Sequence, residues 1–232
     1  MKVSKLHKMI EEGEHLHQDF KFAITDSKKI ARSLSAFANT EGGRLLIGVK
    51  DNGNIVGVSS DEEFYMIEAA GTMYCKPPVE FRTVQWKEGG KIVLEIIVEK
   101  SEQRPHKSPD KDGKYKAYVR VNDNNIVANG VLQKVWRRRK VTQGALITLN
   151  KAEKIILEYL NNNPKITFSH FRRIARIPPY KAEKILVNFV SMDILKMEIT
   201  EKTTYYYSNP EFDEGCSSLS HHKTPDALRG EY

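Results

Sequence analysis

The stretch AFANTEGGRLLIGVKDNGNIVG, residues 36–57, limits what this chain can fold into because it specifies the order of local elements. Ahead of its glycine pair, either Thr25 or Asp26 can cap a helix. The apolar residues that follow the cap recur at helical spacing, so the sequence predicts a helix up to the glycines. Those apolar residues are Ile30, Leu34 and Phe37.

The segment after the glycine pair has β character. RLLIGV predicts a strand, Asn52-Gly53 favours a two-residue hairpin turn, and IVGV predicts the returning strand. A nucleotide-binding glycine loop must instead leave a strand and open onto a helix, whose free N–H groups meet the phosphates. The order found here argues against a nucleoside triphosphate site, and Gly42 is predicted to cap the preceding helix at its C-terminus.

The distribution of charge divides the chain into two parts. Residues 1–135 carry 21 Lys and Arg against 19 Asp and Glu, a balance of +2, whereas residues 136–209 carry 14 against 6, a balance of +8. A length of 232 residues allows two domains that each bury a core. A compact basic region is typical of nucleic-acid binding, with a solvated basic face as the alternative.

Cysteine usage and hydropathy bear on the cellular compartment in which the protein is expected. Cys75 and Cys216 are far apart in sequence and fit no disulfide framework or zinc spacing, which agrees with a reducing compartment. No segment resembles a signal peptide, and no run approaches the roughly 20 apolar residues of a membrane span. A soluble protein in the cytoplasm, without a membrane partner, is therefore expected.

The first part predicts a mixed α and β domain over residues 1–135. Phe20 and Phe22 are expected to share one face of an extended segment. Helices are expected at 3–12, 25–40, 60–74 and 130–140, a hairpin at 79–99, and a strand at 115–123. The fold class is thus α+β.

The second part predicts a small helical module over residues 149–208, after a basic linker at 136–148 and before a flexible tail at 209–232. Asn150 and Glu153 have the spacing of a capping box at the start of its first helix. Two further helices and a β-hairpin follow. Three helices and a hairpin are the winged helix-turn-helix arrangement, in which the third helix enters the major groove of DNA.

The polar side of that third helix carries the candidate DNA-reading residues. Lys181 and Lys184 can reach phosphates or guanine edges, Asn188 can pair with adenine, and Tyr180 can pack on sugar or base. The expected phosphate contacts are Arg172, Arg173, Arg176 and Lys202. A winged helix used only for protein contact or dimerisation is the alternative.

Three motifs of the first part resemble the Schlafen AlbA-like DNA-binding domain family. They are GEHLHQDFKFAI, the A-F-A-N-T-x-G-G block, and YKAYVRVND, in the family's order and together spanning about residues 10–130. The stretch RPHKSPDKDGKYKAYVRVNDNN also resembles the bacterial members, which pair this domain with a C-terminal winged helix-turn-helix. The resemblance implies a DNA-binding transcriptional regulator that needs no cofactor, and it favours a homodimer.

The same resemblance implies an alternative function, because some Schlafen proteins cleave tRNA and rRNA with three carboxylates. Matched by motif, these carboxylates are Glu14, Asp19 and Asp51. Three converging carboxylates could hold Mg²⁺ or Mn²⁺ for a metal-dependent endoribonuclease. Asp19 stands where the family has a glutamate, and Asp51 is also explained by turn chemistry before Asn-Gly.

The first domain also offers a basic surface. Its candidate nucleic-acid contacts are Lys21, Arg104, Lys107 and Arg120, with His106 in the same loop. A solvated loop with ion pairs is the alternative. The sequence therefore predicts a DNA-binding regulator without catalytic activity; RNA is the alternative nucleic acid, and a protein-interaction adaptor is a third function class.

Overall fold

The computed structural model describes residues 4–58, 62–139 and 149–211. The chain divides into two compact units, Met1–Val141 and Thr142–Tyr232, which are considered separately below. Within the described ranges no helix is long and apolar enough to cross a membrane.

The centre of the first unit is a four-stranded sheet with strand order β1-β2-β4-β3. β1 and β2 run parallel, while β4 pairs antiparallel with both β2 and β3. The elements of this part are α1 (Lys5–Glu12), β1 (Gln18–Lys21), α2 (Ser27–Asn39), β2 (Gly43–Ile47), α3 (Glu62–Thr72), β3 (Arg82–Glu88) and β4 (Lys91–Val98).

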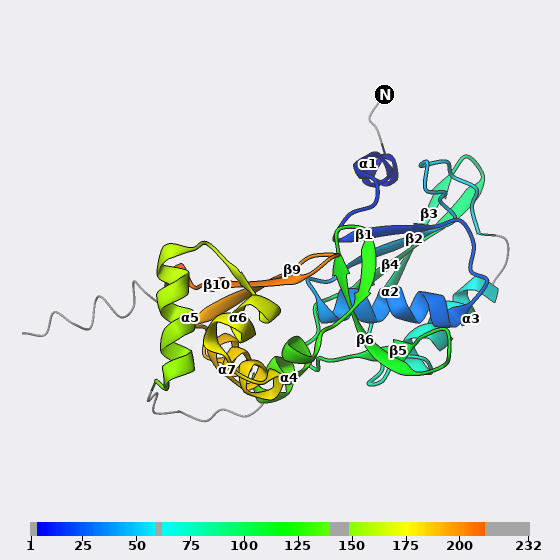
Figure 1. Cartoon of the computed structure of the whole chain (residues 1–232). Helices are drawn as coiled ribbons and strands as arrows, with labels where there is room; N and C mark the ends of the chain where they lie inside the picture. Colours follow the sequence, from blue (N-terminus) through cyan, green and yellow to red (C-terminus); the bar gives the residue numbers. More distant parts are fainter. Residues whose placement is uncertain (1–3, 59–61, 140–148, 212–232) are drawn as a thin grey trace, which may run out of the picture. The chain divides into compact units, whose positions relative to one another are not determined.

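A second, antiparallel sheet with order β5-β6-β7 follows in sequence. Its strands are β5 (Lys107–Pro109), β6 (Tyr115–Val121) and β7 (Asn124–Val127), and α4 (Gly130–Arg139) comes after them. α2 lies between the two sheets, against β2 and β4 on one side and β5 and β6 on the other (Figure 1). The predicted α+β class is confirmed.

The two faces of the four-stranded sheet are covered differently, as its alternating pattern requires. Leu45 and Ile96 point to α2 and join its core, whereas Leu46 and Val93 point to α1 and pack with its Leu6. α1 and α2 therefore lie on opposite faces of the sheet (Figure 1).

The glycine-containing stretch ends α2 much as the sequence predicts, with one shift. The C-cap of α2 is Thr40, and Gly42 follows two residues later. Gly42 has a φ of 75° and donates its N–H to the Phe37 carbonyl at 2.9 Å, so it satisfies one of the last carbonyls of the helix. The prediction of Gly42 as the C-cap itself is wrong, although its role in closing the helix is confirmed.

The predicted hairpin after this strand is wrong beyond its turn. Gly53 has a φ of 81° as the turn requires, but the returning segment makes only an isolated bridge between Val49 and Ile55. The distant strand β4 pairs along β2 instead. The predicted hairpin does not form because β4 offers β2 a longer run of apolar residues to pair with than the adjacent segment does.

Two other expectations for the first unit have opposite outcomes. The hairpin at 79–99 is confirmed as β3 and β4. The expectation that Phe20 and Phe22 share a face is wrong, because β1 ends at Lys21; Phe20 is buried, whereas Phe22 is 59% exposed.

The described residues of the second unit, 149–211, form three helices and a three-stranded sheet with order β8-β10-β9. The predicted capping box is confirmed, since the Asn150 side chain accepts from Glu153 N–H and the Glu153 carboxylate accepts from Asn150 N–H. The short strand β8 was not expected. The elements are α5 (Lys151–Asn162), β8 (Ile166–Thr167), α6 (Phe168–Ala175), α7 (Pro179–Ser191), β9 (Leu195–Ile199) and β10 (Thr204–Ser208).

The segment expected as a linker begins later than the sequence indicated. Residues 136–139 continue α4, and Trp136 is buried. The remainder of that linker, 140–148, and the tail from 212 onward lie outside the described residues.

Candidate functional site

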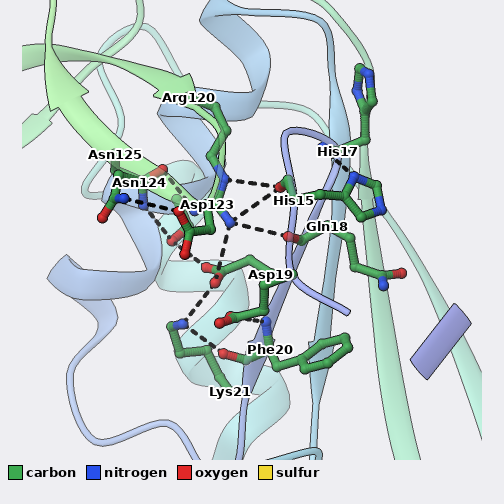
Figure 2. A network of polar contacts seen from close by, with 12 residues as sticks. His15, His17, Gln18, Asp19, Phe20, Lys21, Arg120, Asp123, Asn124 and Asn125 are labelled. Atoms are coloured by element: carbon green, nitrogen blue, oxygen red, sulfur yellow. Dashed lines mark hydrogen bonds and ion pairs between the residues drawn. The ribbon is translucent and has the colours of Figure 1, made fainter. Parts of the chain in front are cut away.

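Asp19 is the centre of a buried polar network in the first unit (Figure 2). Its Oδ1 lies 3.5 Å from Nη2 of Arg120, and its Oδ2 accepts from Ser33 Oγ at 3.1 Å. Asn125 closes the ring, donating to Ser33 Oγ at 3.0 Å and accepting from Arg120 Nη1 at 3.2 Å. The network thus joins β1, α2, β6 and β7 through four side chains.

Arg120 uses its remaining donors on the backbone of residues 15–18. Its guanidinium donates to the carbonyl of His15 at 3.4 Å and to that of Gln18 at 3.1 Å (Figure 2). It also lies over the Phe37 ring. The residue is 3% exposed. The expectation that Arg120 contacts nucleic acid is therefore wrong, because β6 points this side chain inward, where it holds the segment before β1.

The carboxyl groups of Glu14 and Asp19 are close enough to shift each other's pKa. Glu14 Oε1 also accepts from the Phe20 N–H at 2.8 Å. Burial and the Asp19 hydrogen bond raise the pKa of Glu14 to about 7. Burial alone would raise the pKa of Asp19, but the hydrogen bond from Glu14 and the charges of Lys21 and Arg120 lower it below its ordinary value. The pair therefore contains an ionised Asp19 and a Glu14 carboxyl that titrates near neutrality.

The three motif-matched carboxylates are not brought together. Asp51 is an exposed residue of the turn after β2. Within the described ranges, no group of three or more His, Cys, Asp and Glu side chains is placed to hold a metal ion, so Glu14 and Asp19 form a pair without Asp51. The turn interpretation of Asp51 matches its position.

The other basic residues predicted in the first unit differ in accessibility. Lys21 is half-buried and pairs with Asp19 Oδ1 at 3.0 Å. Arg104 is half-buried with its Nη2 4.0 Å from Glu102, whereas Lys107 is exposed. His106, from the same loop, is buried, with Nδ1 2.9 Å from the Pro77 carbonyl and Nε2 2.7 Å from Ser101 Oγ. The predicted basic loop is thus partly a structural element.

Asn39, from the glycine-containing block, is a structural residue that the sequence did not single out. Its amide donates to the carbonyls of His106 and Tyr118, both at 2.8 Å, and its oxygen accepts from His106 N–H. The next residue, Thr40, accepts from Arg120 N–H. The signal that could have found them is that polar residues, Ser33 included, occur in a helix that is buried all round from residue 33 to 39.

The third helix of the second unit, α7, has the two faces that the sequence predicts. Its apolar side is buried through Ala182, Ile185, Leu186, Phe189 and Val190. Tyr180 is 66% exposed, Lys181 and Lys184 are exposed, and Asn188 is half-buried. Of the other cationic candidates, Arg173, Arg176 and Lys202 are exposed and Arg172 is half-buried.

A groove of about 620 Å³ runs between the start of α5 and the helices α6 and α7. Lys181, Lys184 and Asn188 line it from α7, and Asn150 and Lys151 line it from α5. Three of the four candidate base-reading residues therefore border one concave surface. The ammonium groups of Lys181 and Lys184 can bind phosphates, and the amide of Asn188 can pair with a base edge.

Comparison with known proteins identifies the first unit. Residues 14–129, half of the chain, match the family model described as Schlafen, AlbA_2. No curated protein matches the chain.

Two similar solved structures each match about half of the chain. The DIP2311 protein from Corynebacterium diphtheriae is 21% identical with a TM-score of 0.43; the match covers 53% of this chain and only 27% of that one. The N-terminal domain of a RecG-related protein from Nitrosomonas europaea is 18% identical with a TM-score of 0.37, covering 55% of this chain and 97% of that one.

Proposed function

The chain belongs to the Schlafen, AlbA_2 family through residues 14–129, and from this we propose that it binds nucleic acid as a DNA-binding transcriptional regulator without catalytic activity. The family supports nucleic-acid binding in general. The choice of DNA, and of a regulator, rests on the second unit.

The observation that carries the proposal is the two-sided character of α7. One side is buried in the core of the unit, and the other presents Tyr180, Lys181 and Lys184 outward. Three helices followed by the β9–β10 hairpin are the order of a winged helix-turn-helix, whose third helix reads the major groove. In this function α7 is the recognition helix.

The proposed contacts follow from side-chain chemistry. Lys181 and Lys184 bind phosphates or guanine edges, while Asn188 pairs with adenine. The exposed Arg173 and Arg176 at the end of α6, and Lys202 in the hairpin turn, bind phosphates. Phosphate contacts position the protein, and α7 supplies the sequence preference.

The test measures binding of the full-length protein to a fluorescent duplex DNA by anisotropy at low salt. The double variant Lys181→Ala/Lys184→Ala is expected to bind at least tenfold more weakly, because two charged contacts are lost. Lys154→Ala is the matched control, since Lys154 is exposed on α5 and does not line the groove. Absence of binding at low salt, or a double variant that binds as well as the control, would overturn the proposal.

The same preparation tests the non-catalytic part of the proposal. Incubation with tRNA and Mn²⁺ is expected to leave the RNA intact, because Asp51 does not join Glu14 and Asp19. Discrete fragments that disappear in Glu14→Ala and Asp51→Ala would establish the endoribonuclease alternative instead. Binding to neither nucleic acid, with saturable capture of a protein, would establish the adaptor alternative.

A further inference from the structure

The strand β3 forms an open edge of the first unit's four-stranded sheet. It stands at the end of the strand order and pairs only with β4 among the described strands (Figure 1). Its seven residues make no backbone hydrogen bond outside the β3–β4 ladder in the described parts of the chain. A long unpaired edge is a ready template for another strand.

The turn between β3 and β4 determines which backbone groups of this edge point outward. Gly89 and Gly90 have φ of 55° and 76°, as in a two-residue type I′ turn, and Glu88 faces Lys91 across it. In such a hairpin the flanking pair is hydrogen-bonded, and the pairs then alternate along the ladder. The N–H and C=O groups of Thr83, Gln85 and Lys87 therefore face away from β4.

We propose that β3 pairs antiparallel with β3 of a second copy of this chain, about a two-fold axis at Gln85. In this register Gln85 faces its own copy, and Thr83 faces Lys87 of the other chain. These are the residues whose backbone groups point outward, so every pair of them can exchange two hydrogen bonds. The contact is isologous, as two-fold dimers require.

The side chains of the other four residues are self-complementary in the same register. Arg82 faces Glu88 of the second copy at both ends, and Val84 faces Trp86 in the middle. Opposite charges and aromatic to β-branched pairs are favourable cross-strand neighbours, and the register contains no pair of like charges. Shifting it by two residues in either direction leaves two residues at one end of each strand unpaired and breaks both Arg–Glu pairs.

The two charged residues are available for this pairing. The Arg82 side chain is 69% exposed, and its ion pair within the chain is with Glu99 at 3.8 Å, whose side chain is 83% exposed. Glu88 lies 3.8 Å from Nδ1 of His7, and both side chains are more than one third exposed. Exposed pairs of this kind contribute little and exchange readily.

Sedimentation velocity on the full-length protein tests the proposal by charge exchange. The wild-type chain is expected to show a concentration-dependent species of twice the 26.6 kDa mass. Arg82→Glu alone and Glu88→Arg alone each place like charges across the axis, so each is expected to be monomeric. An equimolar mixture of the two variants restores opposite charges at both ends and is expected to dimerise.

The matched controls carry the same charge changes outside β3. Lys111→Glu and Glu102→Arg alter exposed residues and are expected to leave the dimer intact. A wild-type chain that stays monomeric at every concentration would overturn the proposal. So would a mixture of the charge variants that fails to dimerise while circular dichroism shows both of them folded.

Gln85→Pro tests the backbone part of the contact. Its N–H faces away from β4, so proline removes a hydrogen bond to the second copy and leaves the hairpin ladder complete. The variant is expected to be a folded monomer. A folded Gln85→Pro chain that dimerises like the wild type contradicts pairing through this edge.

Discussion

Asp19 and Arg120 keep opposite charges inside the first unit, each nearly removed from solvent. Buried charges are tolerated only when they are paired and hydrogen-bonded, and here Ser33, Asn125 and two backbone carbonyls provide the further partners. Removing one member would leave the other buried without its partner. The network therefore positions the segment before β1 and does not present a charge to a ligand.

Glu14 makes the stability of this unit depend on pH. Its pKa rises from 4.5 to about 7 on folding, so the folded state holds the proton more tightly than the unfolded state. Its stabilising contribution is complete below pH 4.5 and is lost as the pH rises through about 7. Glu14→Gln keeps an acceptor for Phe20 N–H and a donor for Asp19 but does not titrate. The stability of this variant is therefore not expected to fall as the pH rises through about 7.

The measurement compares thermal unfolding of wild type and Glu14→Gln across this pH range. Tryptophan fluorescence follows the first unit selectively, because Trp86 and Trp136 are the chain's two tryptophans and both belong to it. Subtracting the variant's curve of unfolding temperature against pH from that of the wild type removes the contribution of the other titrating groups. Parallel pH dependences would show that Glu14 does not titrate differently in the folded state.

α2 is the element to which the rest of the first unit is attached. It contacts the four-stranded sheet, α3 and the β5-β6-β7 sheet, and its last residue, Asn39, joins β6 to the loop before β5. The A-F-A-N-T-x-G-G block is therefore a junction between sheets. Its polar residues satisfy buried backbone groups that have no strand partner.

Asn39→Ala is expected to destabilise the first unit by about 2 kcal/mol or more, since it leaves two carbonyls and one N–H without their partner in a buried position. Urea unfolding followed by tryptophan fluorescence measures this loss. Asn54→Ala is the matched control, because Asn54 is exposed, and it should change stability by less than about 0.5 kcal/mol. Equal urea midpoints for Asn39→Ala and Asn54→Ala would show that Asn39 does not stabilise the first unit in this way.

The elements that the sequence predicts correctly are those with local causes. Helical periodicity, the capping box at Asn150 and the Gly89-Gly90 turn all lie within a few residues of the structure they specify. Pairing of β2 with β4 depends on residues about fifty positions apart, and no local pattern encodes it. Arg120 and Asp19 are even farther apart in the sequence, and no local pattern encodes their contact. From sequence alone, an arginine in a strand is therefore predicted at the surface.

The two units of the chain contain different candidate sites. The first unit, Met1–Val141, contains the buried polar network and carries 25 Lys and Arg against 19 Asp and Glu, whereas Thr142–Tyr232 carries 12 against 11. Exposed cations of the second unit include Arg173, Lys181 and Lys184. In the proposed function, capture of nucleic acid by the second unit is therefore expected to depend on the local clustering of these exposed cations and not on the net charge of the unit.

The salt dependence of DNA binding can separate phosphate contacts from base contacts in this unit. Each phosphate neutralised adds about 0.9 to the magnitude of the slope of log affinity against log salt. Arg173→Ala/Arg176→Ala is therefore expected to lower that magnitude by roughly 2 and to weaken all duplexes alike. Asn188→Ala changes no charge, so it should keep the wild-type slope while reducing the preference among sequences. Anisotropy titrations at several salt concentrations, on a preferred and a scrambled duplex, measure both quantities. An unchanged slope in the arginine variant would show that these residues do not neutralise phosphates.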